Sequence, residues 1–171
     1  MADTGLLSPT STGEDHNQFT NPTNAYSSNN TYATENVSAE KQDYYNFTFD
    51  VPAGATIDGI EVKAEAVAQV SEPAGWLWDL SWNGGTNYTN SGYGSGDFID
   101  SVEVVYTQGG ATDLWGRSWT DSEFSNTNFR IRVECVDLGS GATLAIDHIQ
   151  VRVYYTAVSA GSKRMLRGHG L

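Results

Sequence analysis

Apolar and polar side chains alternate along most of the chain between residues 43 and 155, which predicts β-strands with one buried and one solvated face. The clearest alternating runs cover residues 43–51, 60–70, 76–82, 102–106, 129–135 and 149–155. Two weaker strands are predicted near residues 30–34 and 115–120. No run is followed by apolar residues at helical spacing, so the pattern predicts an all-β protein.

Turn signals rich in Gly, Ser and Asn separate these runs, as at residues 83–85, 108–110 and 137–142. Short strands at regular intervals are typical of a two-sheet antiparallel β-sandwich, in jelly-roll or Ig-like form. The pattern alone does not choose between these two topologies.

The chain of 171 residues is long enough for one domain with a sizeable core. Residues 1–40 are polar and contain few aliphatic side chains, so they cannot fold on their own. We expect a β-sandwich domain over residues 21–156, an N-terminal arm over residues 1–20 and a basic C-terminal arm over residues 157–171.

Charge is distributed unevenly. The chain has 21 acidic and 9 basic side chains, a formal net charge of −12, which disfavours nucleic acid as a partner. Every acidic residue precedes position 148, whereas the C-terminal arm carries three bases and two apolar side chains: Lys163, Arg164, Met165, Leu166 and Arg167. These side chains, with Leu6 and Leu7 of the N-terminal arm, are predicted to contact an acidic partner or a second copy of the domain. A solvated tail is the alternative.

The single cysteine, Cys135, excludes an internal disulfide, and its alternating register predicts a buried thiol. The N-terminus lacks a basic segment followed by a long apolar run, and no stretch is apolar enough to span a bilayer. We therefore expect synthesis in a cytoplasm, no signal peptide and no membrane partner.

Aromatic residues are concentrated in the predicted loops. Tyr88, Tyr93, Trp115 and Trp119 lie among Asn, Gly and Ser, which is typical of surfaces that stack on sugar rings or contact proteins. The same rings could instead plug the ends of the sandwich. Both interpretations remain open from the sequence.

The sequence offers little evidence for catalysis or for a bound cofactor. His148 has no nucleophile motif to serve, and a strand-end histidine satisfied by local hydrogen bonds is the simpler interpretation. Acidic pairs occur at Asp58/Glu61, Asp97/Asp100 and Asp121/Glu123, where a calcium ion is conceivable but solvated carboxylates are the default. We therefore predict no enzyme activity, no cofactor and no metal.

Several segments resemble the β-sandwich modules of tailed-phage virion proteins of the capsid-decorating (cement) and tail-accessory kind. They are Phe49-Asp-Val-Pro-Ala-Gly-Ala-Thr-Ile-Asp-Gly-Ile-Glu-Val62, Gly109-Gly-Ala-Thr-Asp-Leu-Trp-Gly116 with Trp119-Thr120, Asn21-Pro-Thr-Asn-Ala-Tyr26 with Tyr32-Ala33, and Ile149-Gln-Val-Arg-Val-Tyr-Tyr155. The resemblance spans about residues 20–156. It implies a structural role in a virion, often with threefold or other symmetric contacts.

The main functional hypothesis is a capsid decoration or cement protein that stabilises a shell through its arms. Its expected partners are the major capsid protein or another virion protein and further copies of itself, for example in a trimer. The alternative is a tail- or fibre-associated module that binds host glycans through the aromatic loops. A polysaccharide hydrolase is the third hypothesis, disfavoured because the carboxylates are spread over turns and strand faces rather than paired in a cleft.

Overall fold

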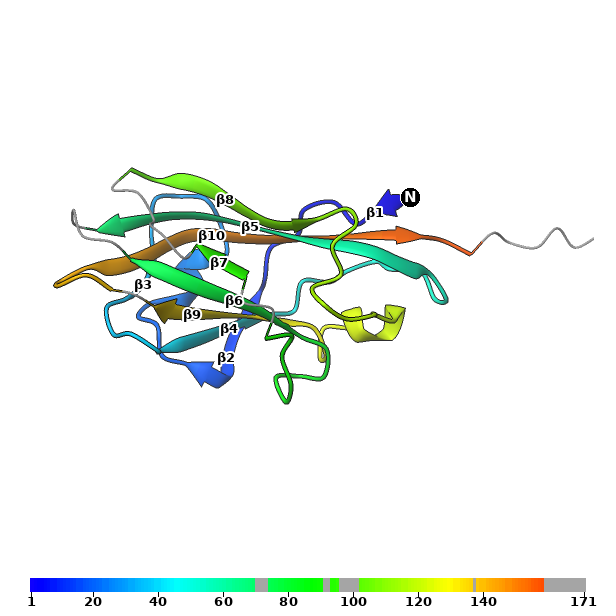
Figure 1. Ribbon diagram of the computed structural model, residues 1–171, viewed down its shortest axis with the longest axis horizontal. Helices are drawn as coiled ribbons and strands as arrows, with labels where there is room; N and C mark the ends of the chain where they lie inside the picture. Colours follow the sequence, from blue (N-terminus) through cyan, green and yellow to red (C-terminus); the bar gives the residue numbers. More distant parts are fainter. Residues whose placement is uncertain (70–73, 91–92, 96–101, 137, 159–171) are drawn as a thin grey trace, which may run out of the picture.

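The computed structural model describes residues 1–69, 74–90, 93–95, 102–136 and 138–158. Two antiparallel sheets pack face to face along the long axis of the molecule (Figure 1). The predicted fold class, a two-sheet antiparallel β-sandwich, is therefore confirmed. Within the described residues, no helix is long and apolar enough to cross a membrane.

Each sheet has five strands. Sheet A contains β1 (Ala2–Asp3), β3 (Ala33–Glu35), β5 (Thr56–Gln69), β8 (Val104–Gly110) and β10 (Thr143–Thr156). Sheet B contains β2 (Ser11–Asn17), β4 (Lys41–Tyr45), β6 (Gly75–Ser81), β7 (Tyr93–Ser95) and β9 (Arg130–Val136). Two short 3-10 helices, η1 (Pro22–Ala25) and η2 (Asp121–Phe124), lie in the connections.

The strand order is that of a jelly roll. From β3 to β6 successive strands alternate between the two sheets, β10 lies between β3 and β5, and β9 lies between β4 and β6. This topology interleaves strands that are far apart in sequence. It therefore brings β4, β6 and β9 side by side, and their outer surfaces form one continuous face.

The core lies between the sheets and follows the period-two pattern. In β5, the buried residues are Ile60, Val62, Ala64, Ala66 and Ala68. In β10, they include Ile149, Val151 and Val153. β6 contributes Trp76 and Trp78, whose ring centroids lie 4.7 Å apart in an edge-to-face arrangement. The inner faces of β5, β6 and β10 thus form much of the apolar core.

The first predicted strand is shorter than expected and has the opposite face buried. β4 ends at Tyr45, and Tyr44, rather than Tyr45, is fully buried. Asn46 and Thr48 have φ angles of 64° and 57°, and this left-handed backbone ends the strand. The segment after β4 therefore leaves sheet B and crosses the end of the sandwich.

The weaker predictions gave mixed results. β3 begins at Ala33, close to the strand predicted near residues 30–34. Residues 115–120 form no strand and lead instead into η2, because Trp115 takes a φ angle of 54° and turns the chain. β8 begins at Val104, after the predicted start of the fourth run.

Residues 1–20, expected as an arm, contribute to both sheets. β1 pairs with the end of β10, Leu7 forms a bridge with Val151, and β2 pairs with β4. Leu7 packs against the core, and Leu6 is half-buried. Lys163, Arg164, Met165, Leu166 and Arg167 lie outside the described residues, so their role stays a prediction.

Cys135 lies in β9 with a fully buried side chain. Burial raises the pKa of its thiol from 9.0 to about 12, and the nearby Glu35 carboxylate makes a smaller contribution in the same direction. Because the thiolate is the reactive form, the native thiol should react with a disulfide reagent at pH 8 at least about a hundredfold more slowly than the urea-unfolded chain. A stopped-flow comparison of the two states measures this ratio, and equal rates would contradict the burial of Cys135.

Candidate functional site

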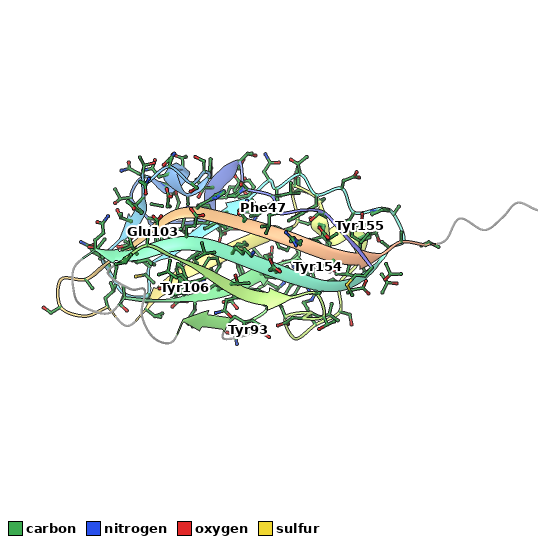
Figure 2. All side chains as sticks on the ribbon, turned by 90° about the horizontal axis from the view of Figure 1, so that it is seen from above. Phe47, Tyr93, Glu103, Tyr106, Tyr154 and Tyr155 are labelled. Carbon is green, nitrogen blue, oxygen red and sulfur yellow. The ribbon has the colours of Figure 1, made fainter. Side chains whose placement is uncertain are left out.

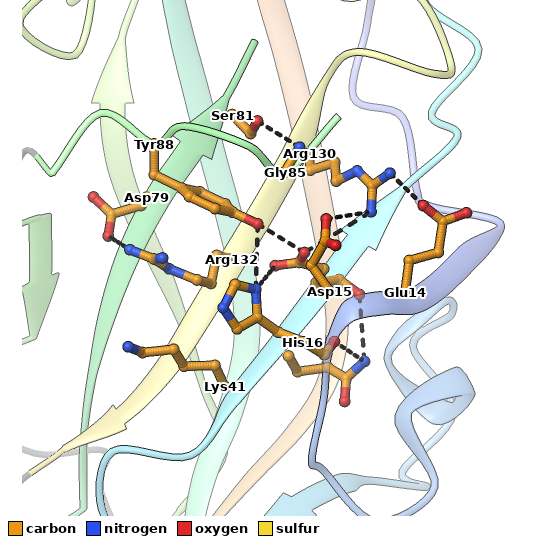
Figure 3. Close-up of polar contacts among 12 residues, drawn as sticks. Glu14, Asp15, His16, Lys41, Asp79, Ser81, Gly85, Tyr88, Arg130 and Arg132 are labelled. Carbon is orange, nitrogen blue, oxygen red and sulfur yellow. Dashed lines mark hydrogen bonds and ion pairs between the residues drawn. The ribbon is translucent and has the colours of Figure 1, made fainter. Parts of the chain in front are cut away.

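The outer surface of sheet B carries charged residues of both signs in alternation. Period-two geometry places Asp43 of β4, Arg130 and Arg132 of β9, and Asp79 of β6 on this side of the sheet (Figure 3). Asp43 lies directly opposite Arg132, which in turn lies opposite Asp79. We call this surface, together with Glu14, Asp15, His16 and Tyr88 (Figure 3) and with Tyr45, whose ring lies against Arg130, the sheet B polar face.

Asp43 is the centre of this face, and its side chain is fully buried. The Tyr88 hydroxyl donates a hydrogen bond to one carboxylate oxygen at 2.7 Å, and His16 Nδ1 lies 3.2 Å from the other. Burial raises the pKa of the Asp43 carboxyl, an effect opposed by the hydrogen bond from Tyr88 and by the nearby charges of His16 and Arg130. The buried Asp43 carboxylate thus fixes the positions of Tyr88 and His16 on the outer side of sheet B.

Two arginines are held between carboxylates and aromatic rings. Arg132 Nη2 lies 2.6 Å from Asp79 Oδ2, and its guanidinium carbon lies 3.9 Å from the centroid of the Tyr88 ring. Arg130 pairs with Glu14, and its guanidinium carbon lies 4.6 Å from the Tyr45 ring centroid. These contacts fix both planar groups in position before any ligand arrives.

Two neighbouring segments complete the face. An irregularity in the pairing of β2 with β4, between Thr12 and Asn17, projects residues 14–16 over the sheet edge. The connection after β6 folds back, with Thr89 N donating to Leu80 O at 2.9 Å, and so places Tyr88 above Arg132. The pKa of the Tyr88 hydroxyl is raised by burial and by the Asp43 charge, so this group stays a hydrogen-bond donor.

The four aromatic residues predicted as contact residues occupy different environments. Tyr88 lies on the sheet B polar face. Tyr93 packs against Trp115 with ring centroids 4.7 Å apart, and its hydroxyl donates to Asp113 at 2.7 Å. Trp115 and Trp119 are 0% and 7% exposed.

The interpretation of Trp115 and Trp119 as exposed contact residues is therefore wrong. The Trp115 indole N–H donates to Ile60 O at 2.9 Å, and that of Trp119 donates to Leu114 O at 2.8 Å. An indole whose N–H is bonded to buried backbone serves packing. Both rings plug the end of the sandwich, which was the other interpretation considered.

Sequence reasoning missed the importance of Asp43, His16, Arg130 and Arg132. The alternating run at residues 129–135 places Arg130 and Arg132 on its polar side, and that register was the available signal. The partner of Arg132, Asp79, lies 53 residues away in the sequence. The partner of Arg130, Glu14, lies in the irregular edge strand β2. No local pattern specifies those pairings.

A second group of carboxylates lies at the other sheet. Glu65, Glu103 and Asp147 each bring one oxygen within 4.8 Å of the others, an arrangement that could supply some of the six to eight oxygens that Ca²⁺ prefers. Figure 2 shows Glu103 towards one end of sheet A, with Tyr154 towards the other end. The backbone N–H of Asn29 also donates to both carboxylate oxygens of Asp147, at 3.1 Å each, so part of the capacity of Asp147 to bind a metal is already used.

His148 lies next to this group. Its Nε2 lies 2.8 Å from Ser8 Oγ, and burial lowers the pKa of the imidazole although Glu65 and Asp147 act in the opposite direction. The histidine lies within β10 rather than at a strand end, and its hydrogen bond joins β10 to Ser8 of the N-terminal segment. Of the predicted acidic pairs, Asp97/Asp100 lies outside the described residues.

In each of the other two acidic pairs, one carboxylate makes hydrogen bonds with nearby groups. Glu123 accepts hydrogen bonds from Arg117 and from the Thr120 amide, each at 2.7 Å. Asp58 accepts one from Thr156 at 2.7 Å. These carboxylates stabilise turns and strand ends.

No family model and no curated protein matches the chain. Solved structures do match it. The CBM36-1 domain of a multidomain xylanase from the hindgut metagenome of Trinervitermes trinervoides is 12% identical, with a TM-score of 0.44, and the alignment covers 92% of this chain and 100% of that domain. The CBM22-1 xylan-binding domain of Paenibacillus barcinonensis Xyn10C is 11% identical, with a TM-score of 0.37, over 78% of this chain and 92% of that domain.

These comparisons correct the earlier family assignment. Both matched structures are carbohydrate-binding modules of xylanases rather than virion proteins. The resemblance to phage virion modules is therefore wrong, and so is the capsid decoration role that rested on it.

Proposed function

We propose that this chain is a carbohydrate-binding module that holds a neutral polysaccharide on the sheet B polar face and has no catalytic activity of its own. The observation that carries the proposal is the alternation of fixed carboxylates and guanidinium groups beside two tyrosine rings on the outer side of sheet B, where Glu14 and part of Arg132 are exposed above the buried Asp43, Asp79 and Arg130.

Sugar hydroxyls suit this mixture of charges because each hydroxyl both donates and accepts hydrogen bonds. Arg132 offers donors, whereas Asp79 and Glu14 offer acceptors within the same surface. Tyr45 and Tyr88 add ring surface and polar hydroxyls, a combination suited to a ligand with apolar C–H faces and polar edges. The contacts among these side chains hold them in place, which reduces the entropy lost on binding.

The charge balance favours a neutral ligand. Acidic and basic side chains alternate on the face, and the chain as a whole carries a formal charge of −12. Such a surface repels phosphate backbones and polyuronates at long range. A neutral chain of sugars experiences no such repulsion and can bind both kinds of charged group.

Hydrolysis is not part of the proposal. A glycosidase needs one carboxyl that can give up a proton and a second that acts as base or nucleophile. Asp79 is paired with Arg132, and Asp43 lies under Tyr88, His16 and Arg130. These contacts suit a fixed binding surface better than an exchange of protons with a substrate.

Arg132→Ala tests the proposal. Because a hydrogen bond to a charged group contributes about 1.5–3 kcal/mol, the variant should bind a neutral polysaccharide about tenfold or more weakly than the wild type. Affinity electrophoresis and calorimetry would use xylan and soluble cellulose derivatives, with polygalacturonate as the anionic comparison. Xylan is included because one matched domain is described as xylan-binding.

Arg152→Ala is the matched control. Arg152 lies on β10 of the opposite sheet and also contacts a tyrosine ring, with its guanidinium carbon 5.8 Å from the Tyr154 centroid. This variant should bind as the wild type does. Equal affinities for the wild type and Arg132→Ala, with both proteins folded by circular dichroism, would count against the sheet B polar face.

A further inference from the structure

We propose that a separate pocket beside η2 binds a single neutral sugar ring. The pocket has a volume of about 250 Å³ and lies where the chain leaves β4 and crosses the end of the sandwich. Its lining includes Phe49, Val51, Asp121, Ser122, Phe124 and Ser125. None of these residues belongs to the sheet B polar face, although the choice of a sugar as occupant rests on the proposed function.

The apolar side of the pocket is a fixed aromatic wall. Phe49 packs edge-to-face against Phe124 and Phe129, with centroid distances of 5.8 and 5.2 Å, and stacks on Phe47 at 5.4 Å. Phe49 nevertheless remains partly exposed, so part of its surface faces the pocket. A half-buried ring held by three others is well suited to stack on the C–H face of a pyranose.

The polar side supplies hydrogen-bonding groups. Within the part of the chain that the structure describes, the Asp121 carboxylate makes no hydrogen bond or ion pair. The hydroxyls of Ser122 and Ser125 each contact one neighbouring hydroxyl at 3.2 Å, which leaves further bonding capacity. One free carboxylate and two hydroxyls opposite an aromatic wall match the hydroxyl edge and the apolar face of a sugar.

Backbone strain supports a binding role for this region. Asn46 and Thr48 adopt left-handed φ angles of 64° and 57°, which is unfavourable above all for a β-branched residue such as Thr48. The Thr48 amide donates to Asn126 Oδ1 at 2.8 Å and so ties this segment to the chain after η2. Strain of this kind persists where the surroundings enforce it, and it is often found at binding sites.

Volume and charge restrict the ligand. The pocket is smaller than the roughly 300–1,000 Å³ of sites for drug-sized molecules, so it fits one ring rather than a longer segment. Asp121 gives the rim a negative charge, which disfavours uronic acids. A neutral sugar unit at the end or side of a polysaccharide therefore fits best.

The test is amide chemical-shift mapping of the full chain with xylohexaose, cellohexaose and a galacturonic acid hexamer. In the wild type, each neutral sugar that binds should shift amides at residues 46–51, 53 and 121–125 as one group, and amides at residues 41–45 and 130–134 as another. Asp121→Asn should weaken the response of the first group about tenfold, because it removes a charged acceptor, and should leave the second unchanged. The galacturonic acid hexamer should not shift the first group.

Asp50→Asn is the matched control, since Asp50 is exposed, belongs to the same segment and does not line the pocket. It should leave both responses unchanged. If only the second group of amides shifts, or if Asp121→Asn binds like the wild type at the first, the pocket proposal is wrong and the proposed function stands. If only the first group shifts, the pocket proposal stands and the sheet B polar face is wrong, and shifts in neither group would refute both.

Discussion

Trp76→Ala is expected to lower the free energy of unfolding by about 3–5 kcal/mol, the range typical of removing a large buried aromatic side chain. Trp76 is fully buried between the two sheets. Its ring packs edge-to-face against Trp78 at 4.7 Å and against Tyr106 at 5.1 Å. The loss of one side chain would therefore disturb contacts from both β6 and β8.

Urea unfolding followed by far-UV circular dichroism measures this change without relying on tryptophan fluorescence. Val105→Ala provides the control, because Val105 lies on β8 and is 54% exposed. Its effect should stay within about 0.5 kcal/mol. A loss below about 1 kcal/mol in Trp76→Ala would mean that the sheets do not pack as described.

Asp43→Ala is expected to lower the free energy of unfolding by about 2–3 kcal/mol and to abolish glycan binding. Removing the carboxylate deprives the Tyr88 hydroxyl and His16 of their partner in a buried position, and lost hydrogen bonds to a charged group cost about 1.5–3 kcal/mol. Tyr88 would no longer be held above Arg132. Thermal unfolding and polysaccharide affinity should therefore change together, and normal affinity in a destabilised variant would contradict the role assigned to Asp43.

Asp43→Asn tests the pKa of this carboxyl. Burial raises that pKa above its ordinary value of 3.8, so the folded chain binds the proton more tightly than the unfolded chain does. The stabilisation that protonated Asp43 provides is complete below the ordinary pKa and is lost as pH rises through the raised value. The free energy of unfolding of the wild type should thus fall relative to that of Asp43→Asn as pH rises above about 4, and a wild type that instead gains stability relative to Asp43→Asn over that range would contradict the shift.

Much of the fold could be predicted from the sequence because burial in a sandwich follows a period of two. β9 matches its predicted run to within one residue at each end, whereas β5 and β10 begin earlier than their predicted runs, at Thr56 and Thr143. The run at 43–51 was misjudged because its end is decided by the left-handed backbone at Asn46 and Thr48 and by the Thr48–Asn126 hydrogen bond. A tertiary contact of this kind leaves no local signal.

The N-terminal strands were missed for a related reason. β1 and β2 join the sheets through backbone hydrogen bonds, and β2 contains no large apolar side chain. Strand pairing through the backbone needs no apolar period. The predicted docking of the C-terminal arm and the formation of homo-oligomers remain predictions.

The candidate site was only partly predictable. Tyr88 was identified as a contact residue from its loop composition, and it does lie on the sheet B polar face. Trp115 and Trp119 lie in loops of similar composition but are buried, because that loop folds over the end of the sandwich. The pairing of Arg132 with Asp79 depends on strand order, which the sequence pattern left open.

The most direct test of the central claim is a crystal structure of the chain soaked with a neutral hexasaccharide, such as xylohexaose, at saturating concentration. The account predicts sugar density along the outer surface of sheet B, with ring oxygens or hydroxyls within about 3.2 Å of the Arg132 guanidinium and the Tyr88 hydroxyl. Density elsewhere on the molecule with an empty sheet B surface would contradict it.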